Sequence, residues 1–120
     1  MLGGEHSISA GLARALHEKY PNLSCLHFDA HGDTREEYHG SKYNHACVMA
    51  RIREFVPSLV QVGIRAIDIE EMENRKKNQH IFFSHEIADP SNTAWMQKAI
   101  TQLTDNVFIS IDLDVFDPAI

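Results

Sequence analysis

The sequence has few of the features that mark several large classes of protein. Its two cysteines, Cys25 and Cys47, are too few for a disulfide framework and lack the spacing of a cysteine metal site, so we interpret both as buried thiols. Its longest basic cluster is Arg75-Lys76-Lys77 and its formal net charge is −6, which argues against binding to nucleic acid or to an anionic membrane. We therefore expect small or cationic partners.

Long hydrophobic runs are also absent. No apolar stretch approaches the length that spans a bilayer, and Met1-Leu2 leads directly into Gly3-Gly4 rather than into a signal peptide, so we predict a cytoplasmic location. The chain has no internal repeat, linker or low-complexity segment. Its 120 residues, 43% of them hydrophobic, are enough for one small domain with a core.

Short apolar runs alternate with helical patterns along the chain. The predicted strands are 24–29, 59–64, 81–84 and 107–112; the predicted helices are 8–19, 44–57, 68–77 and 91–103; residues 34–44 form a long polar loop. Continuous apolar strands that alternate with helices predict an α/β fold, with a parallel sheet covered on both faces. Ligands of such sheets bind beyond the carboxyl ends of the strands.

Acidic side chains follow two of these predicted strands. Asp29, His31 and Asp33 come after the first strand at alternate positions, so all three can face one point. Asp112 and Asp114 come after the last strand at the same spacing. Four carboxylates in one crevice repel each other strongly, and a pair of divalent cations removes that repulsion. The pattern therefore indicates a site for two metal ions.

The turn near the start of the chain supplies a sixth candidate ligand, His6. An oxygen-rich set with only two imidazoles favours Mn²⁺ over Zn²⁺. Each acidic cluster alone has an ordinary interpretation, because Asp-x-His-x-Asp can be a loop with helix-capping acids and Asp-x-Asp is common in proteins that handle phosphates and sugars. Their joint occurrence in one parallel-sheet pattern is far more specific.

Three segments carry a resemblance to a known family. Gly3-Gly4-Glu5-His6-Ser7, Asp29-Ala30-His31-Gly32-Asp33 and the stretch from Ser110 to Pro118 resemble, in order, the three motifs of the ureohydrolases, the family of arginases and agmatinases. The resemblance implies a three-layer α/β/α fold with a parallel sheet, a centre of two Mn²⁺ ions, and hydrolysis of a guanidino group to urea and an amine. Glu5 stands where the family usually has aspartate, a mild variant.

The resemblance also implies residue roles. The metal ligands that it implies are His6, Asp29, Asp33 and Asp112 for one ion, and Asp29, His31, Asp112 and Asp114 for the other. Asp33 would in addition orient the bridging hydroxide for its attack on the guanidinium carbon. His45 matches the histidine that shuttles a proton to the leaving amine, a role that suits imidazole because its pKa lies near operating pH. The alternative for His45 is a histidine at a helix start without a catalytic part.

The substrate is a finer question. Arginases commonly have asparagine two residues after the last aspartate of the second motif, where Arg35 stands here. The surrounding residues look more like agmatinase-type members, which hydrolyse agmatine to putrescine and urea in polyamine metabolism. Asp68 and Glu36 are candidate contacts for a cationic substrate, although both can equally be solvated surface charges. Guanidinobutyrase, formimidoylglutamase and arginase activities remain alternatives.

The family continues beyond the Asp117-Pro118 pair, and its further segments include a carboxylate that clamps the guanidinium. We therefore expect residues 1–120 to be part of a single ureohydrolase domain that is truncated at both ends, an incomplete version of the fold. The isolated piece is expected to be inactive, whereas the full-length protein is expected to be a homo-oligomer. A non-catalytic metal-binding fragment is the competing hypothesis.

Overall fold

The computed structural model describes residues 1–116, so Asp117-Pro118, the end of the third motif, lies outside the described residues. Its sheet has four strands in the order β3-β2-β1-β4, and every neighbouring pair is parallel. The strands are β1 (Leu23–Phe28), β2 (Leu59–Ile64), β3 (Gln79–Phe83) and β4 (Asn106–Ile111). The predicted parallel α/β sheet is confirmed.

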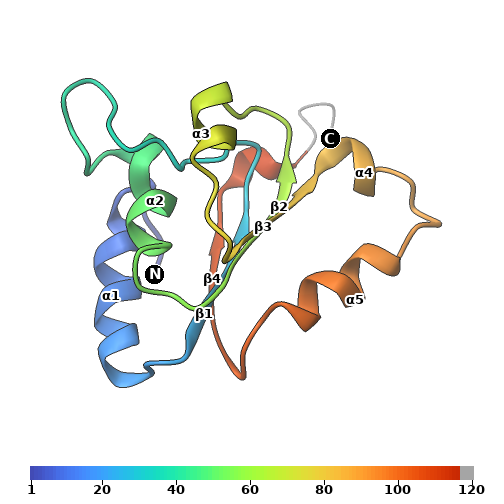
Figure 1. The fold of residues 1–120 in the computed structure, drawn as a ribbon, viewed down its shortest axis with the longest axis horizontal. Helices are drawn as coiled ribbons and strands as arrows, with labels where there is room; N and C mark the ends of the chain where they lie inside the picture. Colours follow the sequence, from blue (N-terminus) through green and yellow to red (C-terminus); the bar gives the residue numbers. More distant parts are fainter. Residues whose placement is uncertain (117–120) are drawn as a thin grey trace.

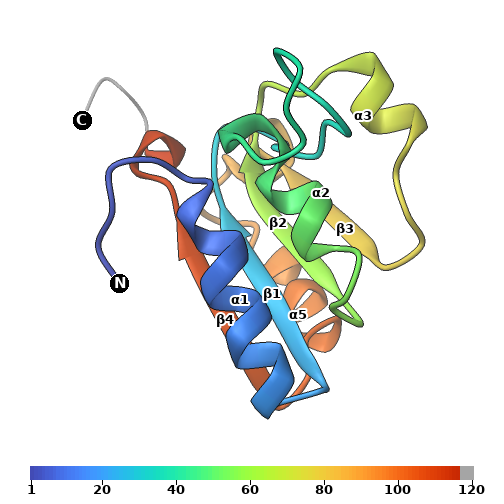
Figure 2. The same cartoon turned by 90° about the vertical axis from the view of Figure 1, so that its left-hand side faces the viewer.

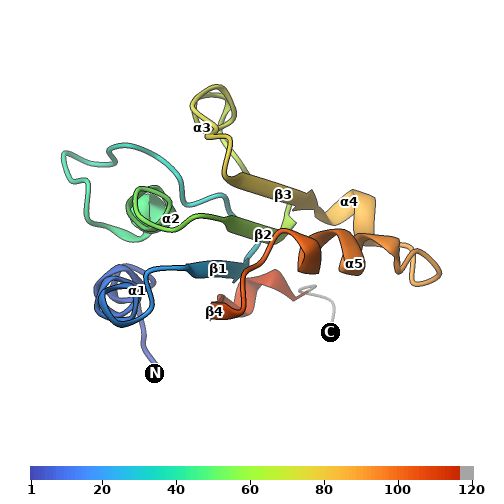
Figure 3. The same ribbon diagram turned by 60° about the horizontal axis from the view of Figure 1, so that its bottom comes forward.

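Helices cover both faces of the sheet and produce three layers (Figures 1 and 3). One face carries α1 (Ile8–Lys19) and α2 (Val48–Ile52), and the other carries α4 (Ser84–Ile87) and α5 (Ala94–Thr101). The short α3 (Ile69–Glu73) lies beyond the carboxyl end of β2, beside the loop that leaves β1 (Figure 1). Figure 2 shows α1 lying along the sheet in front of β1 and β4.

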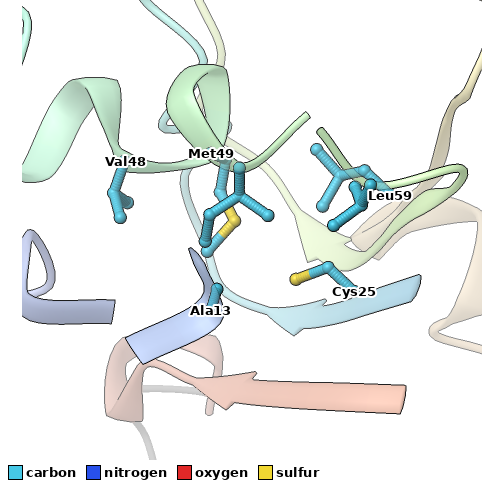
Figure 4. Packing of buried hydrophobic residues seen from close by; sticks show 7 residues of the cluster. Ala13, Cys25, Val48, Met49 and Leu59 are labelled. Atoms are coloured by element: carbon cyan, nitrogen blue, oxygen red, sulfur yellow. The ribbon is translucent and has the colours of Figure 1, made fainter. Parts of the chain in front are cut away.

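Each face of the sheet has its own apolar cluster, because successive side chains of a strand point to opposite faces. Cys25 of β1 and Leu59 of β2 pack with Ala13 and Met49 beneath α1 and α2 (Figure 4). The opposite cluster joins β2 to α5 through Val60, Val62 and Ala99. Cys25 and Cys47 are both free and buried, as predicted.

Several element boundaries differ from the prediction. The 44–57 helix is a 3-10 turn, η1 (His45–Cys47), followed by the short α2, and Asn44 does not cap it, because its amide donates to the carbonyl of Tyr38 at 2.6 Å. The last helix begins at Ala94, not at 91, because Ser91 instead closes a turn on the Asp89 carboxylate.

Two further differences from the predicted elements arise because the pattern of apolar residues along the chain does not indicate them. β3 begins at Gln79. The polar side chain of Gln79 does not extend the apolar run from which the strand was predicted, although it is hydrogen-bonded inside the protein. The prediction also missed the single-turn α4 and the 3-10 turn η2 (Leu113–Val115), which are too short to produce a periodic pattern. Among the residues described, no helix is long and apolar enough to cross a membrane.

Candidate metal centre

The carboxyl ends of β1 and β4 meet at one edge of the sheet, because these strands are neighbours and Phe28 pairs with Ile111. Asp29 follows β1 directly, and Asp112 follows β4 directly. The turn before α1 carries His6 to the same place, where its Nδ1 lies 3.9 Å from an Asp112 carboxylate oxygen. Three distant segments of the chain thus converge at this edge, at the top of Figure 1.

One group of side chains gathers around His6. Its Nδ1 lies 2.9 Å from Asp33 Oδ2 and 3.4 Å from Asp29 Oδ2, while its Nε2 is hydrogen-bonded to Ser110 Oγ at 2.8 Å. Ser110 therefore turns one ring nitrogen away and leaves Nδ1 facing the carboxylates. His6, Asp29 and Asp33 offer ligand atoms that lie within 4.8 Å of one another.

A second group gathers around His31, whose Nδ1 lies 3.5 Å from Asp29 Oδ1 and 3.0 Å from Asp114 Oδ2. The two oxygens of Asp29 therefore face different groups, with Oδ2 toward His6 and Oδ1 toward His31. Asp112 stands between them, since one of its oxygens accepts a hydrogen bond from the Asp114 amide at 3.2 Å and the other lies toward His6. This arrangement suits two ions that share Asp29.

Charge interactions within the first group are strong because its members are mostly buried. Burial lowers the pKa of His6, but the hydrogen bonds and charges of Asp29 and Asp33 outweigh burial and raise the pKa to about 9. Burial raises the pKa of Asp29, but the hydrogen bonds from His27 and His6 outweigh it and hold that pKa far below its ordinary range. The carboxylates thus attract a cation, and for the same reason they favour the protonated form of His6.

The backbone at Asp33 is held in an uncommon conformation, with a φ of 52° in the left-handed region. Its carbonyl accepts hydrogen bonds from the amides of Met49 at 2.9 Å and Ala50 at 3.2 Å, in the first turn of α2. These bonds fix the loop to the helix, and in this conformation the carboxylate of Asp33 points toward His6.

Glu71 of α3 holds the residue after Asp33. Its Oε1 accepts from the Thr34 amide at 2.7 Å and from the Thr34 hydroxyl at 3.0 Å, while Oε2 accepts from the Asp68 amide at 2.9 Å. Glu71 is only 5% exposed, and Thr34 is fully enclosed. One buried carboxylate thus joins the loop after β1 to the N-terminus of α3.

A cleft of about 720 Å³ opens over the two groups. Its lining contains one guanidinium, three imidazoles and several carboxylates, those of Glu5, Asp33, Asp68, Glu71, Asp112 and Asp114. The excess of carboxylates makes the cleft attractive to cations. Ala66 and Ile67, from the segment between β2 and α3, line the same cleft.

The rim carries the two other predicted residues that line the cleft. His45 lies with its Nδ1 3.4 Å from Glu5 Oε1, and Asp68 pairs with Arg35 at 2.9 Å, while the Arg35 guanidinium lies over the Tyr38 ring. These rim side chains are roughly 40–60% exposed and can therefore rearrange around a ligand.

Glu36, predicted as a substrate contact, does not line the cleft. Its carboxylate oxygens are occupied by Arg51 at 2.6 Å and Arg53 at 2.7 Å, and this double pairing lowers the pKa of Glu36 although partial burial opposes the shift. The structure therefore brings together all of the sequence-predicted site residues except Glu36, which lies in a separate ion-pair cluster.

Sequence reasoning did not single out Glu71, although it follows Asp68 at the spacing of a capping box, a signal that could have indicated the contact with the start of α3. Its bond to Thr34 had no such signal. His27, two residues before Asp29, is fully buried, and its Nε2 lies 2.8 Å from Asp29 Oδ2.

Comparison with known proteins identifies the family of the chain. A model of the arginase family matches residues 1–120. N(1)-aminopropylagmatine ureohydrolase of Synechocystis sp. is 42% identical over 98% of this chain and 39% of its own length, and the agmatinase of Bacillus subtilis is 33% identical over 98% of this chain and 40% of its own.

The crystal structure of agmatine ureohydrolase of Thermoplasma volcanium superposes with a TM-score of 0.86 at 34% identity, over 99% of this chain and 40% of that one. The chain thus spans about 40% of the length of these relatives. Because the family model matches every residue and the fold agrees, the chain belongs to the arginase family.

Proposed function

We propose that the protein is a manganese-dependent ureohydrolase of the agmatinase type, which hydrolyses agmatine to putrescine and urea. The observation that carries the proposal is the orientation of Asp29, whose two oxygens face two separate groups of ligand atoms. A carboxylate in this position can bridge two ions. The proposed ligands are those predicted from the sequence, namely His6, Asp29, His31, Asp33, Asp112 and Asp114.

The donor set supports manganese as the metal. Four carboxylates and two imidazoles form a hard, oxygen-rich site, which suits Mn²⁺ better than a metal that prefers thiolates. When bound, two such ions polarise the guanidino group and lower the pKa of water. The chain itself must keep the site compact without the ions, and the hydrogen bonds of His6 to Asp33 and Ser110 do so.

Asp33 and His45 are the proposed catalytic residues. Asp33 accepts a hydrogen bond from the attacking water and so directs its oxygen at the guanidinium carbon. Attack makes a tetrahedral centre as the water gives one proton to Asp33. The bond from carbon to the alkylated nitrogen then breaks as that nitrogen takes up a proton. The proton on Asp33 and the one left on the new hydroxyl pass to the departing amine and back to the proton donor, which leaves neutral urea and an ammonium. His45 on the rim, whose Nδ1 lies 3.4 Å from Glu5 Oε1, donates the proton that the nitrogen takes up.

The charge of the cleft supports a substrate with a second cation. Agmatine carries an ammonium at the end opposite its guanidinium, and Asp68 is the proposed contact for it. That ammonium must compete with Arg35, which occupies Asp68 at 2.9 Å. Because both side chains are about 40% exposed, the pair costs little to separate.

N(1)-aminopropylagmatine is a second candidate substrate. The observation in its favour is the 42% identity to the Synechocystis enzyme named for that substrate. Its aminopropyl group adds one more cation, and the acidic rim suits both molecules. Guanidinobutyrate, by contrast, carries a carboxylate, which the acidic cleft would repel.

The test measures urea release by the longest natural polypeptide that contains this chain, loaded with Mn²⁺. We expect turnover of agmatine or N(1)-aminopropylagmatine, with inhibition by putrescine. His45→Asn should lower kcat by about 10²- to 10⁴-fold without changing the number of ions bound. His85→Asn is the matched control, because His85 of α4 does not line the cleft.

Turnover of none of these guanidino compounds would refute the proposal and favour a non-catalytic metal-binding protein. Inhibition by simple acids rather than by putrescine would favour a carboxylate-bearing substrate.

The family context also supports proposing that residues 1–120 are part of one larger ureohydrolase domain, and that the whole protein is a cytoplasmic homo-oligomer. Gel filtration of the purified polypeptide tests its oligomeric state.

A further inference from the structure

A line of polar side chains crosses the otherwise apolar interior on the α1–α2 face of the sheet. It consists of His27 on β1, Gln61 on β2, Gln79 on β3 and Arg53 after α2. All four are at most 4% exposed. Buried polar groups of this kind are costly unless they are hydrogen-bonded, so their bonds need a full account.

Each bond in the line continues the previous one. Arg53 Nη1 lies 3.0 Å from Gln79 Oε1, Gln79 Nε2 lies 2.6 Å from Gln61 Oε1, and Gln61 Nε2 lies 3.0 Å from His27 Nδ1. His27 Nε2 then lies 2.8 Å from Asp29 Oδ2. The line therefore ends on the carboxylate proposed to bridge two ions.

The direction of every bond is determined by the two ends of the line. A guanidinium only donates hydrogen bonds, so Arg53 must donate to the side-chain oxygen of Gln79. The side-chain nitrogen of Gln79 is then the atom that donates to the oxygen of Gln61. The Gln61 nitrogen also lies 2.7 Å from the Gly32 carbonyl, which only accepts, and this independently fixes the orientation of the Gln61 amide. His27 Nδ1 consequently accepts a hydrogen bond, and the ring proton is on Nε2.

The far end of the line is anchored in the loop after β1. Arg53 Nη2 donates to the Thr34 carbonyl at 3.3 Å and to Glu36 at 2.7 Å. Glu36, which does not reach the cleft, thus holds the guanidinium that starts the line. Thr34 follows the proposed ligand Asp33, so the network connects both ligand-bearing ends of the segment between 29 and 33.

We propose that His27 is a positioning residue, held as the Nε2–H tautomer by Gln61, and that it fixes the Asp29 carboxylate with one oxygen toward each ligand group. The inference rests on the proposed metal site. Without the bond to Oδ2, rotation of the Asp29 side chain would let both oxygens turn toward one group. Partners that orient metal ligands in this way typically change metal affinity by about 10- to 100-fold.

The first test is the tautomer itself, read from the ¹⁵N shifts of the His27 ring in histidine-labelled protein without added metal. We expect a protonated Nε2 and an unprotonated Nδ1, and we expect Gln79→Leu, which interrupts the line two side chains away, to reduce this preference. A proton on Nδ1, or on both nitrogens, would overturn the inference. This result does not depend on metal binding, so it stands even where the proposed function fails.

The second test is Mn²⁺ affinity by calorimetry, with the unfolding midpoint of each variant measured in parallel. His27→Phe keeps the ring size and should weaken binding by about 10- to 100-fold, while His27→Gln, which retains a side-chain N–H, should recover part of that loss. Val60→Ala is the matched control, since Val60 is fully buried on the opposite face of β2 and its truncation lowers stability without touching the line.

Wild-type affinity in His27→Phe, or a loss no larger than that of Val60→Ala, would overturn the positioning role. If His27→Phe does not fold, the Mn²⁺ affinities of Gln79→Leu and His27→Gln are used instead. Wild-type affinity in both of these variants would overturn the positioning role. A wild-type protein that binds no Mn²⁺ would instead refute the proposed metal site, and is thereby distinguished from a failure of the His27 role.

Discussion

Replacing Glu71 by glutamine should destabilise the protein and loosen the proposed metal site together. The Glu71 carboxylate accepts three hydrogen bonds, two from Thr34 and one from the Asp68 amide. A glutamine can keep its oxygen on Thr34, but its nitrogen then faces the Asp68 N–H, so one charge-assisted bond is replaced by two opposed donors. The expected loss in the free energy of unfolding is about 2 kcal/mol.

Two further variants calibrate that magnitude. Glu71→Ala removes both acceptor oxygens, and with them all three hydrogen bonds, and leaves both Thr34 donors unpaired in an enclosed position, so we expect a loss of about 4 kcal/mol. Glu70→Gln is the matched control because Glu70 is an exposed neighbour on the same helix, and its side chain should contribute less than about 0.5 kcal/mol.

The assays are urea-induced unfolding and Mn²⁺ calorimetry on the same preparations. Glu71→Gln should weaken Mn²⁺ binding as well as stability, because Thr34 follows Asp33 and its displacement moves that carboxylate away from His6. A Glu71→Gln protein that unfolds at the same urea concentration as Glu70→Gln would show that the buried carboxylate does not hold the loop, and the reasoning would be wrong.

Two other predictions concern the backbone of β2 and the charge on His6. Gly63→Ala should cost about 2–3 kcal/mol in urea unfolding, because Gly63 has a φ of 93° and an added Cβ would lie 2.7 Å from Val115; Gly11→Ala, in open space on α1, should be neutral or stabilising. In metal-free protein, the His6 pKa is raised from 6.5 to about 9, so its contribution of roughly 3 kcal/mol is present below pH 6.5 and disappears as the pH rises through 9. Urea unfolding from pH 6 to 10 measures this loss, which His6→Asn should abolish; a flat wild-type profile would contradict the ion pairing described here.

The position of the site was predictable because it depends on local spacing and on one rule of topology. Asp29, His31 and Asp33 follow a strand whose apolar run is visible in the sequence, and parallel strands deliver their carboxyl ends to one edge. Asp112 joins them only because β4 lies next to β1, and the strand order β3-β2-β1-β4 has no signature in the sequence. Only the resemblance of the three motifs to those of a known family indicated that the acidic residues after β1 and β4 lie together.

The supporting residues were harder to predict because their partners are distant in the chain. Gln61 interrupts an apolar strand, and such a buried polar residue is a signal that something must bond to it, but the sequence does not say what. Gln79 lies 18 residues further on and Arg53 eight residues before, and only the assembled sheet brings them together. Glu36 was predicted as a substrate contact but does not line the cleft for the same reason, since Arg51 and Arg53 bind its carboxylate from α2 and its end.

The left-handed backbone of Asp33 also restricts which amino acids can evolve at that position. Aspartate and asparagine tolerate a positive φ better than glutamate does, so glutamate would be disfavoured there even if a longer carboxylate could reach the same ions. The backbone thus admits asparagine, which lacks the negative charge. A homologue that differs by Asp33→Asn alone would keep the shape of the loop and lose an anionic ligand, so this single position would distinguish fold-preserving relatives that had given up the metal from those that retain it.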